Sequence, residues 1–175
     1  MAETDILPEF RLWTPEGFRD DVWQCAETLA TGQRTILPVS AYLQLDETIR
    51  CRRREEIGVE LQPADEIAII EHYLDLLPMI ALVFPAFSDG RSFSKAELLR
   101  SRCRYQGKLR ATGEVLIDQI PLMMRTGFDE FLVSNETALK RLAARRLNGL
   151  PNHYQPAARH AARPARTYSW RRWSA

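Results

Sequence analysis

Five short runs rich in β-branched and other apolar residues alternate with runs of helical period, and this alternation most constrains the fold. The runs are residues 34–39, 57–61, 79–84, 108–111 and 131–133. The third run, Met-Ile-Ala-Leu-Val-Phe, carries no charge, as expected of a strand buried on both faces. Strand–helix–strand alternation favours a parallel sheet covered by helices. We therefore predict a single α/β domain with a mostly parallel sheet of about five strands. The sheet is expected to be open, Rossmann-like or flavodoxin-like, with a half-barrel of the same elements as the alternative.

Helical segments are expected between these strands, over residues 67–77, 94–105, 116–126 and from Asn135 onward. Ser94 and Glu97 have the spacing of a capping box, which predicts a helix start at Ser94. Pro121 lies inside the third of these segments and is expected to kink or break it, because proline lacks an amide donor. Asn135 is expected to cap the last helix.

The chain is expected to have three parts. Residues 1–33 are interpreted as a helical N-terminal lead-in, since Phe18, Val22 and Cys25 follow a helical spacing. Residues 34–150 form the α/β domain. Residues 151–175 hold five of the 24 basic residues and none of the 23 acidic ones, with Trp170 and Trp173 among them. This basic tail is interpreted as either disordered or docked on its own domain or on a partner.

Several classes of protein are disfavoured by composition and spacing. No apolar run approaches the ~18–20 residues of a membrane helix, so we expect no membrane association. The acidic start without an apolar core argues against a secretion signal and, with three widely spaced cysteines, predicts a cytoplasmic protein. The cysteines and the three histidines share no metal-ligand spacing, so no metal is predicted. The tail lacks the interleaved basic and aromatic pattern that would favour nucleic acid.

Two polar loops follow predicted strands, at residues 85–94 and 112–115. In a parallel sheet ligands gather at the carboxyl ends of the strands, so these loops define the expected site. Arg91 and Arg110 are its anion-binding candidates, with the hydroxyls of Ser92, Ser94 and Thr112 as donors. The candidates for a catalytic acid or base are Glu114 and Asp118. The remaining orienting or structural positions are Asp89, Gly90, Gly113 and Gln119.

A purely structural interpretation competes with that site. Asp89 and Glu114 would neutralise the arginines and pin the two loops together, without any ligand. The loops match neither the G-x-G-x-x-G dinucleotide pattern nor a P-loop, so no cofactor is identified.

Residues 87–131 also carry a set of short blocks: F-S-D-G-R-S-F-S, L-L-R, G-K-L-R-A-T-G-E-V, D-Q and G-F-D. These blocks resemble a bacterial family known as a domain of unknown function and often labelled an oxidoreductase of sulfite reduction. The chain departs from its pattern at Ser92, Lys108 and Glu114, where glycine, glutamate and aspartate are usual. The positions that match are Asp89, Gly90, Arg91, Ser94, Arg100, Gly107, Arg110, Ala111, Gly113, Asp118, Gln119, Gly127, Phe128 and Asp129.

The resemblance implies a small cytoplasmic protein encoded beside the haem-dependent sulfite or nitrite reductase, with no established catalytic residue or cofactor. Our first hypothesis is an accessory protein of assimilatory sulfite reduction that binds the reductase, an anionic ligand, or both. The alternatives are an oxidoreductase that uses a bound or partner-supplied redox cofactor, and a non-catalytic interaction module.

Overall fold

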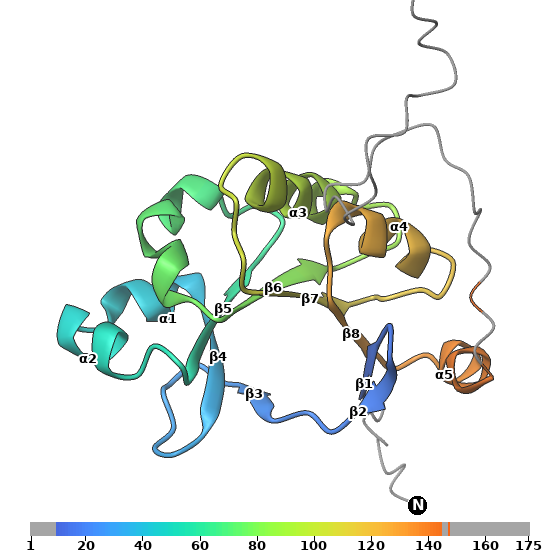
Figure 1. Ribbon diagram of the computed structural model, residues 1–175, viewed down its shortest axis with the longest axis horizontal. Helices are drawn as coiled ribbons and strands as arrows, with labels where there is room; N and C mark the ends of the chain where they lie inside the picture. The colour runs from blue at the N-terminus through green and yellow to red at the C-terminus, as the bar shows by residue number, and fades with distance from the viewer. Residues whose placement is uncertain (1–9, 145–146, 148–175) are drawn as a thin grey trace, which may run out of the picture.

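A single curled sheet forms the centre of the computed structural model, which describes residues 10–144 and 147 (Figure 1). The order of its eight strands is β2-β1-β8-β7-β6-β5-β4-β3. Their bounds are β1 Arg11–Thr14, β2 Gly17–Arg19, β3 Trp23–Cys25, β4 Arg34–Pro38, β5 Ile57–Leu61, β6 Met79–Phe84, β7 Lys108–Gly113 and β8 Glu130–Val133. The five strands expected from the apolar runs are all present, as β4 to β8, and they pair in parallel.

The N-terminal part differs from the prediction. Residues 10–33, expected to be helical, contain the three strands β1, β2 and β3 instead. Gly17 has a φ of +127°, which closes a tight hairpin in which Thr14 faces Gly17. β1 then pairs antiparallel with β8, while β3 pairs in parallel with β4 at the opposite edge. The helical spacing of Phe18, Val22 and Cys25 was misleading because pairing with distant strands overrides a local pattern.

The strand order also decides between the two expected architectures. β3 to β8 follow one another in chain order without the reversal that defines a doubly wound sheet. Crossovers of one hand then place the helices that connect parallel strands on the same face, and Figure 1 shows the described helices on the outside of the curl. The prediction of an open α/β sheet flanked by helices is confirmed, but the doubly wound form and the number of about five strands were wrong. The sheet has eight strands, is partly antiparallel, and has the half-barrel form of the alternative.

The helices are α1 Val39–Gln44, α2 Glu47–Arg52, α3 Arg91–Ser101, α4 Ile120–Thr126 and α5 Glu136–Ala143, with the 3₁₀ helices η1 Ile67–Ile69 and η2 Glu71–Leu76. The helix expected over 67–77 is thus two 3₁₀ segments, although its apolar residues Ile70 and Leu74 are buried as the spacing predicted. Asn135 caps α5 as predicted, since its side chain accepts from the Ala138 amide at 2.9 Å.

Two helix starts were predicted wrongly. α3 begins at Arg91, after Gly90, so Ser94 lies inside the helix and the capping box does not form. α4 begins at Ile120, which puts Pro121 in its first turn, where an amide donor has no partner within the helix. Pro121 therefore lies at the start of α4 and does not kink or break it.

The two faces of the sheet differ in character. Strand residues on the outer face pack with the helices into the main apolar core, which includes Val59, Ile80, Leu82 and Phe131. The inner face holds a small apolar cluster of Ile36, Met79 and Ala81, together with charged side chains. The predicted basic tail, 151–175, and residues 1–9 lie outside the described residues.

Candidate functional site

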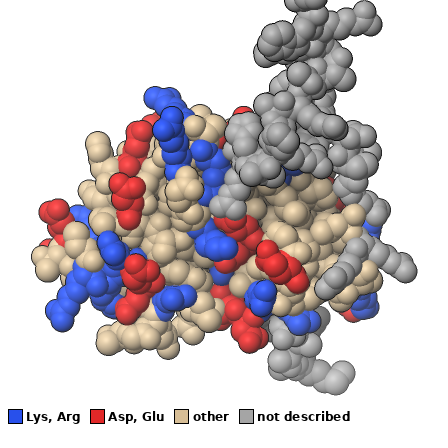
Figure 2. Space-filling model, viewed as in Figure 1, with Lys and Arg blue, Asp and Glu red and all other residues tan. Residues whose placement is uncertain are grey.

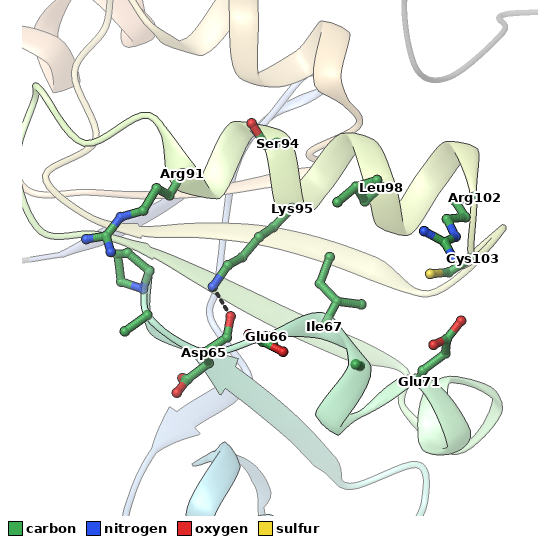
Figure 3. A pocket seen from close by; sticks show the side chains of 13 residues that line it. Asp65, Glu66, Ile67, Glu71, Arg91, Ser94, Lys95, Leu98, Arg102 and Cys103 are labelled. Carbon is green, nitrogen blue, oxygen red and sulfur yellow. Dashed lines mark hydrogen bonds between the residues drawn. The ribbon is translucent and has the colours of Figure 1, made fainter.

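A groove of about 520 Å³ lies between α3 and residues 63–71, the segment that follows β5 (Figure 3). Residues 63–68 and Glu71 form one wall, and residues of α3 and the turn after it form the other. Because β5 and β6 are parallel neighbours, both walls begin at the carboxyl ends of strands. This is the end at which half-barrel and full-barrel sheets present their loops for binding.

Lys95 is the most constrained charge of this groove. Its side chain points from α3 toward Asp65 in Figure 3, and the residue is only 9% exposed. Nζ donates to the backbone carbonyl oxygens of Gln62, at 2.6 Å, and of Asp65. Within the described residues no carboxylate forms an ion pair with it. The Asp65 carboxylate accepts from the Gln62 amide, and Asp65 and Asp89 act on the Lys95 charge only from a distance. Burial lowers the pKa of Lys95, and an anion in the groove would compensate its charge.

Arg91 lies at the same end of the groove, one helical turn before Lys95. The Asp89 carboxylate accepts two bonds from Nε, one from Nη2 at 2.6 Å and one from the Arg91 backbone amide. These bonds lower the pKa of Asp89 to about 2 and raise that of Arg91. Asp89 thus orients the guanidinium and leaves Nη1 without a hydrogen bond among the residues described. Ser94, which lies between Arg91 and Lys95 in the sequence, is also among the lining residues, although its hydroxyl points away from Lys95 in Figure 3.

The two polar loops lie side by side, as predicted. β6 and β7 pair in register up to Phe84 and Gly113. Glu114 Oε2 accepts from the Phe87 amide at 2.8 Å, and Gln119 Nε2 donates to the Phe87 carbonyl oxygen at 3.2 Å. Gly113 has a φ of +84°, and a Cβ there would lie 2.4 Å from the Phe84 carbonyl oxygen. Glu114 and Gln119 therefore clamp the first loop, which matches the pinning of the loops in the structural interpretation. Glu114 does so through a backbone amide and not by pairing with an arginine.

Several predicted site residues lie away from the groove. Ser92 is buried and its hydroxyl donates to the Val83 carbonyl oxygen at 2.6 Å. Arg110 and Thr112 project from β7 to the inner face, opposite the core residues Leu109 and Ala111. Asp118 is largely exposed and lies 3.8 Å from Arg141. Of the predicted anion-binding set, only Arg91 and Ser94 line the groove.

Arg110 forms a separate charged cluster on the inner face. Its side chain is 1% exposed and lies 2.8 Å from Asp21 and 2.8 Å from Glu130. Asp21 belongs to the segment between β2 and β3, which crosses the open side of the curl in Figure 1. The cluster ties this segment to the middle of the sheet. Sequence reasoning missed Asp21 because it placed that residue on a helix.

The residues that carry the family resemblance mainly build the scaffold. Arg100 Nη2 lies 2.6 Å from Asp129 Oδ2, and both side chains are buried. Arg100 also donates to the backbone carbonyl oxygens of Tyr105, Gly107 and Gly127. Gly127 has a φ of +105°, and a Cβ there would meet Arg100 Cγ at 2.5 Å. These matched positions join α3 to the strands β7 and β8.

The two acids predicted as catalytic candidates do not contribute to the groove. The Glu114 carboxylate is engaged by a backbone amide and Asp118 lies outside the groove, so neither is placed to act on a ligand there. No three acidic, histidine or cysteine residues among those described could together hold a metal ion. No described helix combines the length and apolar character needed to cross a bilayer. Figure 2 shows basic and acidic side chains close together on one face.

Lys95 and the segment 63–71 were also missed by sequence reasoning, although a signal for Lys95 existed. It follows Arg91 by four residues, which places both cations on one side of a helix.

The comparison with known protein families identifies one that matches this chain. A family model described as "Bacterial protein of unknown function (DUF934)" matches residues 58–165. No curated protein matches the chain. The matched range omits β1 to β4, which the structure places in the same sheet.

Proposed function

The chain belongs to the bacterial family of unknown function DUF934, and we propose that it is an accessory protein of sulfite reduction that binds an anionic ligand in the α3 groove. The observation that supports anion binding is the Lys95 ammonium, which lines the groove and, among the described residues, has two carbonyl partners and no ion pair. The carboxylates of Asp65 and Asp89 act on this buried charge from a distance but form no ion pair with it, which favours an anion beside the ammonium. The link to sulfite reduction comes from the resemblance of the blocks in residues 87–131.

The proposed protein partner is the sulfite or nitrite reductase, and one surface feature supports a protein contact. Phe87 is 62% exposed, yet its backbone is held by Glu114 and Gln119. A large exposed ring on a fixed loop loses little conformational freedom when a partner covers it.

Retention of the reductase on the immobilised protein tests whether Phe87 contacts it. We expect Phe87→Ser to reduce retention and Leu122→Ser, an exposed apolar position on α4, to leave it unchanged.

Removing a groove cation should weaken anion binding. We expect calorimetric titration with sulfite and sulfate to show binding that falls at least tenfold in Lys95→Met and in Arg91→Gln. Hydrogen bonds to charged groups contribute about 1.5–3 kcal/mol, which corresponds to that loss. Arg54→Gln is the control, since Arg54 is exposed and outside the groove. Equal affinity of all four proteins, or no binding by the unmutated one, contradicts the proposal.

The pH dependence of sulfate binding follows from Lys95. The charged ammonium binds the anion, so affinity is highest below the pKa of Lys95 and is lost as the pH rises through it. Because burial lowers this pKa from its ordinary value of 10.5, the loss should begin at a lower pH than an exposed lysine would give. Titrations of the unmutated protein and of Lys95→Arg between pH 7 and 10 measure this. Identical pH profiles of the two proteins would count against Lys95 as the binding group.

A further inference from the structure

The groove continues beyond its cationic end into an apolar section. In Figure 3, Arg91 and Lys95 lie toward one end, and Ile67 and Leu98 face each other farther along the groove. Ala64 and Ala68 add small apolar surfaces to the same wall as Ile67. Leu98 is 45% exposed although it lies on the helix that covers the core. An exposed leucine opposite an isoleucine offers a surface that gains by being covered.

The size of the groove gives an independent argument. Its volume of about 520 Å³ lies within the range of sites that hold organic ligands of drug size. A water molecule occupies about 30 Å³ in the liquid, and a three-oxygen anion is only a few times larger. A bare oxyanion at Lys95 would therefore fill one end and leave the apolar section in contact with water.

We infer that the groove takes an organic anion, with a carboxylate or sulfonate head at Arg91 and Lys95 and an apolar body between Ile67 and Leu98. This inference rests on the proposed function, since it names the ligand class of the same site. The head compensates the Lys95 charge and meets Nη1 of Arg91, which has no hydrogen bond to any residue that the structure describes. The body covers apolar surface that an inorganic anion leaves exposed.

The opposite end of the groove limits the length of that body. Glu71, Arg102 and Cys103 line it, and Figure 3 shows them beyond Leu98. An alkyl chain that reaches them displaces water from charged groups without replacing their hydrogen bonds, which is unfavourable. Affinity should therefore rise with chain length and then stop rising.

A homologous series of alkyl sulfonates, from methane- to hexanesulfonate, tests the inference by calorimetry, with sulfate as the inorganic reference. We expect the dissociation constant to fall about threefold per methylene, slightly less than the roughly fourfold of complete burial, before it levels off. Leu98→Ser should flatten this series while keeping sulfate binding. Lys95→Met should weaken every member of the series. Leu122→Ser is the matched control and should leave the series unchanged.

The outcomes separate this inference from the proposed function. Sulfate bound as tightly as hexanesulfonate overturns the organic anion and leaves the anion site in place. A chain-length dependence that persists in Leu98→Ser, or that appears equally with the uncharged alcohols, overturns the placement in the groove. If the protein binds neither sulfate nor any sulfonate, both the organic-anion inference and the proposed anion binding are contradicted.

Discussion

Replacing Arg100 with methionine should lower the free energy of unfolding by about 3–5 kcal/mol. Methionine keeps the apolar stem of the side chain, so the loss reports the guanidinium. The substitution leaves Asp129 as a buried carboxylate without its 2.6 Å partner and removes the donor to three backbone carbonyl oxygens. Breaking a buried ion pair from one side carries a cost of about this size.

Urea denaturation followed by circular dichroism measures the effect. Arg54→Met serves as the control, since the exposed pair of Arg54 with Glu55, at 3.5 Å, should contribute less than about 1 kcal/mol. Asp129→Asn is a milder second variant, because it removes the charge but keeps an acceptor for the Leu109 amide. A loss below about 1 kcal/mol in Arg100→Met would show that this network does not hold α3 to the sheet.

Replacing Arg110 with methionine should also destabilise the protein, by about 3 kcal/mol. The two carboxylates of Asp21 and Glu130 would then face each other across the inner face without a cation. Both keep partial contact with water, so we expect the lower end of the range for a broken buried pair.

The triple variant Arg110→Met/Asp21→Asn/Glu130→Gln separates repulsion from lost attachment. Its neutral side chains remove the uncompensated charges, so most of the stability should return. Hydrogen exchange of residues 20–25 provides the second measurement. In Arg110→Met, and in Asp21→Asn alone, these amides should exchange faster than in the unmutated protein, while the amides of β6 keep their exchange rates. Unchanged protection there would show that the strands on either side hold this segment without Arg110.

The central strands could be predicted from sequence because their character is local. The run from Met79 to Phe84 is uncharged and is bounded by prolines, so it reads as a buried strand in any context. β1, β2 and β3 are no such apolar runs, because their sequences, RLWT, GFR and WQC, mix apolar with polar residues. Their pairing depends on β8 and β4, residues far away in the chain, and no local pattern reports that.

In the candidate site, too, only the features that follow from neighbouring residues in the sequence could be predicted. The adjacency of the two loops followed from the parallel order of β6 and β7, and the structure confirms it. Arg110 was misplaced because alternation along β7 was not applied to it: Leu109 faces the helices, so Arg110 faces the opposite side. The groove itself depends on how the segment after β5 meets α3, which is set by packing and by the contacts of Lys95.

The position of β1 beside β8 has a consequence for synthesis on the ribosome. Trp13 pairs with Phe131, so the edge of β1 that pairs with β8 has no partner until 118 residues have been synthesised after Trp13. At about 5–20 residues per second this interval lasts roughly 6–24 seconds. Throughout it, Leu12 and Trp13, both buried in the finished sheet, are accessible to chaperones and to other nascent chains. These two side chains therefore reach their final neighbours only after β8 has been synthesised.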